Sequence, residues 1–219
     1  MNLWLTRIAP DQRSREARRD GTNAVDLHHR LMALFPDRAV ETAARQNLGV
    51  LFRTEPAADG GHQILLQSSV QPDLTRLPPG YGRGATKSLA PLLAAMREGL
   101  AVRYRIAANP IRKPGRTTRE LYNLSAVVPL RGAAADDWWT RQADGAGLQL
   151  TALRSEPLDA ARGTRRSDQH HIKHDRVLFE GIARITDPEL LRTRLTAGIG
   201  KGKAYGCGLL SLAPHRDDQ

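Results

Sequence analysis

Hydrophobic residues in the first third of the chain recur at spacings that predict a strand, a helix and two more strands. The predicted elements, in order, are a strand at residues 3–8, a loop at 11–20, a helix at 24–35 and strands at 48–53 and 63–69. In the helix, Leu27, Leu31 and Leu34 mark the stripe that we expect to be buried. Asn23 is a suitable N-cap for this helix, and Pro36 is a suitable stop.

The second half of the chain shows a similar order of elements. We expect strands at residues 100–108, 148–154, 177–185 and 209–212, and helices at 133–143 and 188–197. In the first of these strands, Val102, Tyr104 and Ile106 alternate with Arg103 and Arg105, which predicts one basic face. Two halves of this βαββαβ kind predict an α+β chain with tandem ferredoxin-like domains. Because this fold serves many functions, it does not by itself identify one.

A segment rich in breakers of regular structure, residues 77–84, lies between the two halves and is the expected junction. We therefore expect an N-terminal domain at residues 1–85 and a C-terminal domain at residues 86–219. The pattern at residues 85–99 fits either a helix or a divergent strand, and both remain open.

A basic glycine-rich loop lies between the last predicted helix and the last predicted strand. Its glycines are Gly198, Gly200, Gly202, Gly206 and Gly208, and its lysines are Lys201 and Lys203. Such glycines allow positive φ and bring backbone N–H groups near a ligand, while lysines favour phosphate. The loop matches neither the P-loop nor the dinucleotide motif, because Ala204 follows Lys203 and no helix begins there. We therefore expect it to bind a polynucleotide backbone rather than a mononucleotide.

The chain carries an excess of positive charge. With 33 Lys and Arg against 23 Asp and Glu, its formal net charge is +10, which favours polyanionic partners and salt-dependent binding. An arginine bias in a GC-rich genome is the alternative, but it does not explain clustering. The clusters are Arg13, Arg15, Arg18 and Arg19; Arg112, Lys113, Arg116 and Arg119; and Arg162, Arg165, Arg166, Lys173 and Arg176. We interpret the last cluster as a basic hairpin that reaches the phosphates of structured RNA, with a purely solvated arm as the alternative.

Cysteine usage and the N-terminus favour a reducing compartment. Cys207 is the single cysteine, so the chain has no internal disulfide framework. The N-terminus lacks the apolar core of a signal peptide, and no segment approaches the length of a transmembrane helix. We therefore expect a soluble cytoplasmic protein without membrane contacts.

His28 is the candidate catalytic residue. It lies at the margin of the apolar stripe, whereas His29 falls on the wetter side of the helix. An imidazole acts as base or acid near neutral pH, which suits metal-free RNA cleavage by the substrate's own 2′-hydroxyl. A hydrogen-bonded structural histidine is the alternative. A zinc site at His170, His171 and His174 has no accompanying cysteine pair, and we expect neither a metal nor another cofactor.

Several short segments occur in a specific order and spacing over nearly the whole chain. They are residues 14–20, Leu27-His28 ahead of Leu34-Phe35-Pro36, residues 65–68, 104–110 and 177–181, and the glycine-rich segment 198–214. Together they resemble the CasE (Cse3) family of the RAMP superfamily, endoribonucleases that process CRISPR precursor RNA in type I-E systems.

The resemblance implies a metal-independent endoribonuclease that cleaves at the 3′ base of the repeat stem-loop. Such an enzyme leaves a 5′-hydroxyl and a 2′,3′-cyclic phosphate, keeps the mature crRNA and joins the other subunits of the surveillance complex (Cascade). His28 falls at the family's catalytic histidine. Together with the charge clusters, the resemblance predicts RNA contacts at Arg15, Arg18, Arg19, His29, Arg162, Arg165, Arg166, Lys173, Lys201 and Lys203.

The chain departs from the family at Val25, where some members carry a tyrosine that assists the reaction. The acid that protonates the leaving group is therefore open: His29 or a lysine is a candidate, and His28 acting with electrostatic help alone is the alternative. A non-catalytic scaffold that holds the guide hairpin without cutting it is the competing hypothesis. A metal-dependent nuclease that uses the histidines at 170–174 is a third, which chelation would stop.

Overall fold

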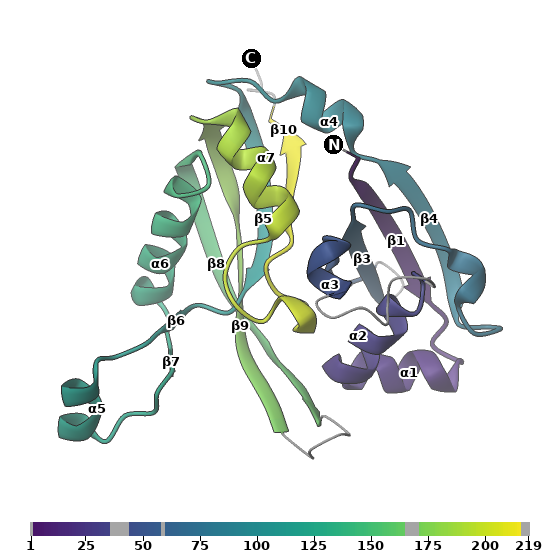
Figure 1. The fold of residues 1–219 in the computed structure, drawn as a ribbon, viewed down its shortest axis with the longest axis horizontal. Coiled ribbons are helices and arrows are strands. Elements are labelled where there is room, and N and C mark those ends of the chain that lie inside the picture. Colours follow the sequence, from purple (N-terminus) through teal and green to yellow (C-terminus); the bar gives the residue numbers. More distant parts are fainter. Residues whose placement is uncertain (1, 36–43, 58–59, 165–170, 216–219) are drawn as a thin grey trace.

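Two antiparallel sheets stand side by side in the protein (Figure 1). The computed structural model describes residues 2–35, 44–57, 60–164 and 171–215. In this part of the chain the first sheet has the strand order β2-β3-β1-β4, and the second has the order β10-β5-β9-β8. Both are the strand order of a ferredoxin-like fold with antiparallel neighbours, so the predicted tandem ferredoxin-like architecture is confirmed.

The first sheet is built from the N-terminal part of the chain. Its elements are β1 (Trp4–Pro10), α1 (Arg15–Thr22), α2 (Ala24–Met32), α3 (Ala44–Asn47), β2 (Leu51–Pro56), β3 (His62–Ser68), the 3-10 helix η1 (Leu74–Arg76) and β4 (Gly82–Ser88). The predicted strand, helix and two strands are all present, with bounds shifted by a few residues. The crossover from β3 to β4 contains only η1, so this half lacks the second long helix of the fold in the part described.

The second sheet follows the same plan and carries an insertion. Its elements are α4 (Ala90–Ala95), β5 (Ala101–Ala108), β6 (Ile111–Arg112), α5 (Arg116–Tyr122), β7 (Val128–Pro129), α6 (Ala133–Asp144), β8 (Leu148–Thr164), β9 (His171–Ile185), α7 (Pro188–Ala197), the 3-10 helix η2 (Lys203–Tyr205) and β10 (Leu210–Pro214). The strands and helices predicted for this half are present. The segment from β6 to β7 was not predicted, and it carries α5 away from the body of the molecule (Figure 1).

The expected loop at residues 11–20 is wrong, because most of it forms α1. Ser14 caps this helix by accepting a hydrogen bond from the Ala17 N–H at 3.3 Å. Ala17 and Asp20 are buried, and the Asp20 carboxylate accepts a hydrogen bond from Arg30 on α2 at 2.8 Å. A contact with a neighbouring helix therefore stabilises a segment whose charged composition suggested a loop.

The first sheet continues beyond the expected division at residue 85. β4 pairs with β1 from Pro10↔Gly82 to Trp4↔Ser88, so residue 85 lies inside a strand of the first sheet. The segment at residues 85–99, for which a helix and a strand were both open, contains the end of β4 followed by α4. The exact boundary between the two domains stays a prediction.

Each sheet buries one face beneath its helices. Ile8, Phe52 and Leu66 belong to the core of the first half, and Trp139 and Phe179 stack in the core of the second with ring centroids 5.7 Å apart. Full burial of one such side chain contributes about 1.5–3 kcal/mol. The two cores hold α2 and the glycine-rich loop in defined positions on their sheets.

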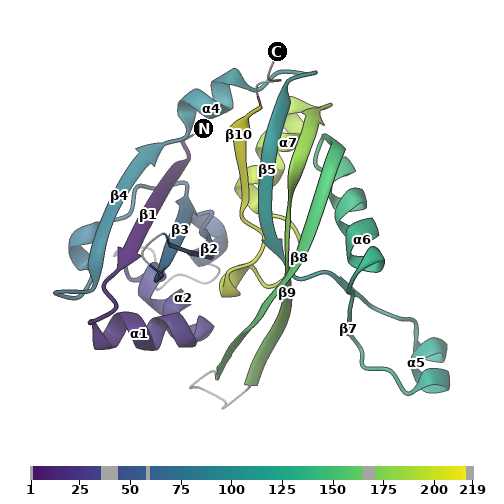
Figure 2. The same ribbon diagram turned by 180° about the vertical axis from the view of Figure 1, so that it is seen from behind.

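β8 and β9 extend beyond the second sheet as a two-stranded arm, residues 158–164 and 171–176, which the sequence predicted as a basic hairpin (Figure 2). Arg162 pairs with Lys173 across the arm, and Thr164 pairs with His171. The register shifts between Leu158 and Ala161, and such an irregularity bends a strand and increases its twist. The arm consequently departs from the direction of the sheet.

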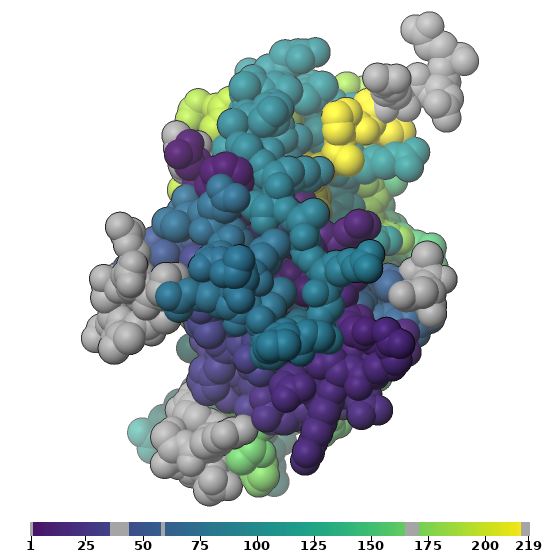
Figure 3. All heavy atoms as spheres, turned by 90° about the vertical axis from the view of Figure 1, so that its right-hand side faces the viewer, coloured from purple at the N-terminus to yellow at the C-terminus, as the bar shows by residue number. Residues whose placement is uncertain are grey.

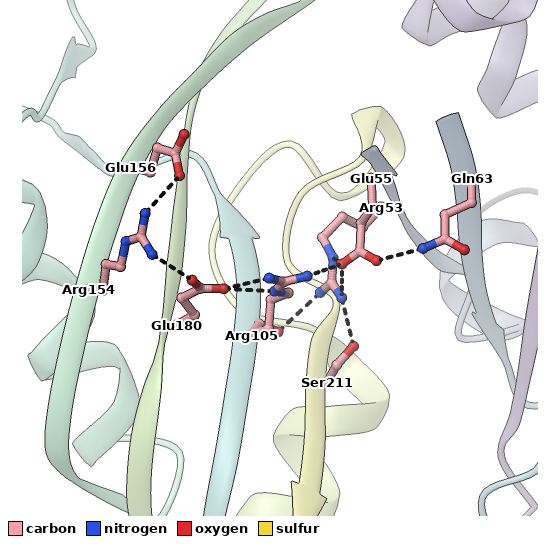
Figure 4. A network of polar contacts seen from close by, with 8 residues as sticks. All are labelled: Arg53, Glu55, Gln63, Arg105, Arg154, Glu156, Glu180 and Ser211. Atoms are coloured by element: carbon pink, nitrogen blue, oxygen red, sulfur yellow. Dashed lines mark hydrogen bonds and ion pairs between the residues drawn. The ribbon is translucent and has the colours of Figure 1, made fainter. Parts of the chain in front are cut away.

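Arg53 on β2 joins the two halves (Figure 4). Its guanidinium is 2% exposed and donates hydrogen bonds to the carbonyl oxygens of Leu209 at 2.9 Å and Arg105 at 3.1 Å, and to Ser211 Oγ at 3.0 Å. The Glu55 carboxylate, 2.8 Å away, balances its charge. Because a buried cation without partners is costly, this set of contacts fixes how the first sheet sits on β5 and β10.

Candidate functional site

His28 lies in the middle of α2 with its ring half-buried. Asn23 caps the helix by accepting hydrogen bonds from the Val25 and Asp26 N–H groups at 3.0 and 3.3 Å, and Leu27 and Leu31 anchor it in the core. His28 Nδ1 is buried and has no hydrogen-bond partner among the described residues. The predicted position of His28 at the margin of the buried stripe is therefore confirmed, as is the exposure of His29.

The surroundings of His28 favour a neutral imidazole. Burial, and then the nearby charges of His29 and Arg45, lower the pKa of His28 to about 4. The rings of His28 and His29 have centroids 5.8 Å apart. At neutral pH the His28 ring is therefore a proton acceptor.

The glycine-rich loop adopts the positive φ angles that its sequence predicts. Its five glycines Gly198, Gly200, Gly202, Gly206 and Gly208 have φ between 73° and 87°. The loop is pinned at its ends by Ile199 N–H donating to Gly208 O at 3.0 Å and Gly208 N–H donating to Ala107 O at 2.8 Å. Its backbone conformation is therefore set by glycine and by contacts with β5.

Lys203, in η2, sits where cations gather. Its Nζ donates to the Ala197 carbonyl at the C-terminus of α7 at 2.7 Å, an end of a helix that attracts positive charge. Burial, and then the charges of Arg45, Lys201 and Arg194, lower the pKa of Lys203. Mutually repelling cations of this kind form a site that an anion stabilises.

The fold brings His28 and the glycine-rich loop together. α2 of the first half contacts η2 of the second half, and β2 contacts η2 as well. Arg45, on α3, lowers the pKa of both His28 and Lys203, and its guanidinium donates to the Val50 carbonyl at 3.1 Å. A proton acceptor and a group of cations from both halves therefore meet at one place.

The arm reaches the N-terminal end of α2. A Cβ atom on Gly163 would lie 2.6 Å from Asn23 Oδ1, and β8 contacts α2 along this line. Arg162 and Lys173 are exposed on the arm beside this contact. Arg165 and Arg166, which the sequence also predicted as RNA contacts, lie outside the described residues.

The basic residues of α1 lie on the surface of the N-terminal half, whose purple and blue residues form most of the face in Figure 3. Arg15, Arg18 and Arg19 are exposed. Arg19 forms ion pairs with Asp20 at 3.3 Å and Asp26 at 3.6 Å, so its charge is partly balanced within the protein.

Two contributors to the site were missed by the sequence interpretation. Arg45 gave no signal, because it belongs to no charge cluster and its proximity to His28 depends on the packing of α3. His174 was considered only for zinc, whereas its Nδ1 lies 2.9 Å from Asn109 Nδ2 and its ring stacks on Tyr205 with centroids 5.1 Å apart. Asn109 and Tyr205 come from β5's end and η2, so only the fold relates them.

The chain belongs to the CRISPR associated protein family, whose family model matches residues 3–214. None of the helices in the described segments is both long and apolar enough to cross a membrane.

The individual relatives point to one branch of this family. The chain is 30% identical over 223 residues to the CRISPR-associated endoribonuclease Cse3 of Thermus thermophilus, covering 97% of this chain and all of that protein. It is 30% identical over 194 residues to the CRISPR system Cascade subunit CasE of Escherichia coli, covering 86% of this chain and 90% of that protein. The structure of Thermus thermophilus Cse3 bound to an RNA representing a pre-cleavage complex is similar, with a TM-score of 0.81, 30% identity, and coverage of 98% of this chain and 100% of that one.

Proposed function

We propose that this protein is a metal-independent endoribonuclease that cleaves CRISPR precursor RNA at the 3′ base of the repeat stem-loop. The contact between α2 and η2 carries this proposal, because it joins a neutral histidine to a cationic loop. His28 acts as the catalytic base, and Lys203 and Arg45 stabilise the charge that develops on phosphate. The relatedness to an endoribonuclease over nearly the full chain supports this.

Cleavage then proceeds without water or metal. His28 accepts the proton of the 2′-hydroxyl, the 2′-oxygen attacks the adjacent phosphorus, and the bond from phosphorus to the 5′-oxygen breaks. The upstream fragment ends in a 2′,3′-cyclic phosphate. The departing oxygen takes a proton and becomes a 5′-hydroxyl, and Lys203 and His29 are the candidate donors. The cations next to α2 stabilise the pentacoordinate transition state more than the ground state.

Binding of the hairpin falls to the arm and to the surface beside it. Arg162 and Lys173 are exposed on the arm, so their side chains can contact phosphate without a rearrangement of the protein. Arg165 and Arg166 extend the same basic segment, and Arg15 and Arg18 on α1 add positive charge. These contacts are equal before and after cleavage, so the protein keeps its product and turns over once.

After cleavage, the protein stays bound to the crRNA and acts as part of a larger complex. We place it as a subunit of the type I-E surveillance complex, as the relatedness to a Cascade subunit supports. Its partners are therefore the crRNA hairpin and neighbouring subunits, and its location is the cytoplasm.

A non-catalytic scaffold is the second candidate function, and Val25 favours it. Val25 is 3% exposed beneath the arm and carries no group that can donate a proton. If no other residue supplies the acid, the protein binds the repeat hairpin but leaves it intact.

The deciding experiment measures single-turnover cleavage of a labelled cognate repeat hairpin in EDTA. Wild type, His28→Ala and an RNA with 2′-deoxyribose at the scissile nucleotide are compared, and hairpin affinity is measured in parallel. We expect cleavage by wild type only, only with the 2′-hydroxyl present, and unchanged affinity of His28→Ala for the hairpin.

Each other outcome selects an alternative. Tight binding of the hairpin by wild type without cleavage supports the scaffold. Cleavage by wild type that occurs without EDTA but is lost in its presence indicates a metal-dependent nuclease. Loss of hairpin binding by His28→Ala, or loss of its folded structure by circular dichroism, returns His28 to a structural role.

A further inference from the structure

A cavity lies beside the glycine-rich loop, whose Lys201 helps to line it. Its volume is about 420 Å³, within the range of pockets that bind small ligands. It lies between the segment from β6 to β7, strand β9 and the loop. Its lining residues are Asn109, Ile111, Lys113, Val127, Pro129, Lys173, His174, Asp175 and Lys201.

One wall of this cavity is polar and fixed. Asn109 is 4% exposed, and its amide donates to His174 Nδ1 at 2.9 Å, which leaves the proton of a neutral His174 ring on Nε2. His174 stacks on Tyr205, and residue 109 forms a backbone bridge with Lys201. These contacts connect the wall directly to η2 and to the loop that carries Lys203.

Positive charge dominates the cavity. Lys113, Lys173 and Lys201 enter from three different segments, against the single carboxylate of Asp175. That carboxylate already pairs with Arg131 at 3.1 Å and with Lys173 at 3.7 Å. Within the described ranges, neither Lys113 nor Lys201 has an ion-pair partner. Unbalanced lysines around one cavity repel one another, and a bound phosphate relieves that repulsion.

The segment from β6 to β7 gives the cavity an apolar part. Ile111, Val127 and Pro129 line it, and Val127 is 39% exposed. Lysines alone would suit a free phosphate, whereas an apolar wall beside them suits a phosphate that is attached to a flat, weakly polar base. Bases of single-stranded RNA can leave the stack and enter such a site, but bases inside a stem cannot.

We propose that this cavity binds one unpaired nucleotide of the RNA at the base of the repeat stem. The inference rests on the proposed function. That function puts the scissile phosphate at His28 and Lys203, and the cavity adjoins the same glycine-rich loop through Lys201. The nucleotide belongs to one of the two single-stranded flanks of the stem, upstream or downstream. The lysines hold its phosphate, and Ile111, Val127 and Pro129 contact its base.

The test uses three RNAs made from the cognate repeat, each with 2′-deoxyribose at the scissile position. They are the bare stem-loop, the stem-loop with its upstream flank and the stem-loop with its downstream flank. Binding constants are measured for wild type, Lys113→Gln and Arg116→Gln at two salt concentrations. Arg116→Gln is the matched control, because it removes one charge from an exposed side chain that does not line the cavity.

We expect one flanked RNA to bind wild type more tightly than the bare stem-loop. In Lys113→Gln, the affinity for this flanked RNA should be about fivefold lower than in wild type near 0.1 M salt, the size expected for one single-strand phosphate contact. The same change should leave the affinity for the bare stem-loop unchanged, and Arg116→Gln should behave as wild type.

The outcomes separate the inference from the function on which it rests. If neither flank adds affinity, or if Lys113→Gln and Arg116→Gln behave alike, the nucleotide site is overturned while the endoribonuclease remains. A cavity that instead binds an acidic peptide of a neighbouring subunit gives this same flank-independent result. If wild type fails to bind even the bare stem-loop, both proposals are overturned.

Discussion

Gly163 of the arm packs against Val25 in the first turn of α2, where a Cβ atom on residue 163 would lie 2.8 Å from Val25 Cγ2. The same Cβ would lie 2.6 Å from Asn23 Oδ1, the atom that caps α2. The element that we propose to bind the RNA stem therefore touches the helix that carries His28. The contact therefore links the position of the arm to the first turn of α2.

Gly163→Ala should consequently disturb both the arm and the cap of α2. We expect a loss of about 1–3 kcal/mol in the free energy of unfolding, as for an overpacked interior. Single-turnover cleavage should slow by about tenfold or more, because small displacements of a catalytic group have large effects. Urea denaturation and cleavage assays measure the two effects. Gly115→Ala is the control, because a Cβ there meets nothing within 4 Å, and equal effects of both changes would contradict the importance of the contact.

The low pKa of His28 predicts a pH dependence of stability. The folded protein has a His28 pKa of about 4, whereas an unfolded histidine has one near 6.5. Between these values the unfolded chain binds a proton that the folded protein does not, so the contribution of His28 to stability falls as pH falls from about 6.5 toward 4. Above pH 6.5 this contribution is complete.

Comparison of wild type with His28→Gln isolates this effect from other titrating groups, such as His174, whose pKa burial also lowers. We expect the difference in unfolding free energy between the two proteins to be constant from pH 7 to 8 and to change steadily from pH 6.5 to 4.5. The change should favour the variant at low pH. Parallel stability curves over the whole range would contradict a depressed pKa, and a direct titration of the His28 ring by NMR would decide the matter.

The sequence predicted the elements of the fold where hydrophobic spacing is regular. The alternation of Tyr104 with Arg105 and the helical spacing of Leu27 and Leu31 led to β5 and α2 with small errors in bounds. α1 was missed because its burial is small, and a tertiary ion pair between Asp20 and Arg30 provides the stabilisation. No local pattern contains that pair.

The candidate site was predictable only in parts. His28 was found from its place on a helix, and the loop with Lys203 from its glycines. Their meeting across the two halves, and the presence of Arg45 beside both, depend on how the sheets pack. β8 and β9 were predicted too short, at residues 148–154 and 177–185. In the structure β8 continues to residue 164 and β9 begins at residue 171, because the two strands pair with each other beyond the sheet.

Arg53→Met should weaken the contact between the two halves and lower the stability of the protein. The change leaves the Glu55 carboxylate without its buried cation and removes the hydrogen bonds that Arg53 donates to the Leu209 and Arg105 carbonyls. We expect a loss of about 3–5 kcal/mol in the free energy of unfolding, the usual result of breaking a buried ion pair. Cleavage should fall as well, because this contact sets the position of the glycine-rich loop against α2.

Arg154→Met is the matched control for Arg53→Met. Arg154 belongs to the same chain of ion pairs through Glu180, but its side chain is 73% exposed (Figure 4). Exposed pairs of this kind contribute about 0–1 kcal/mol. Equal losses of stability for both variants in urea denaturation would show that Arg53 does not join the halves in the way described.

Gly208→Ala should displace the glycine-rich loop. The residue has φ of +87°, and a Cβ on it would lie 2.6 Å from the Ile199 carbonyl oxygen. Two penalties therefore add up. The strained dihedral angle costs about 1–3 kcal/mol, and the Cβ also clashes with backbone atoms that cannot rotate away. The hydrogen bonds of residue 208 with Ile199 and Ala107 weaken, and Lys203 moves relative to His28.

Gly80→Ala separates the two penalties. Gly80 has a similar φ of +72°, but a Cβ there meets nothing within 4 Å. We expect Gly80→Ala to lose stability and keep its cleavage rate, and Gly208→Ala to lose more stability together with most of its cleavage rate while the affinity for the repeat hairpin changes little. Full cleavage by Gly208→Ala would mean that the loop does not position a charge on the scissile phosphate. Lys203 would then have only the structural role of donating a hydrogen bond to the last carbonyl of α7.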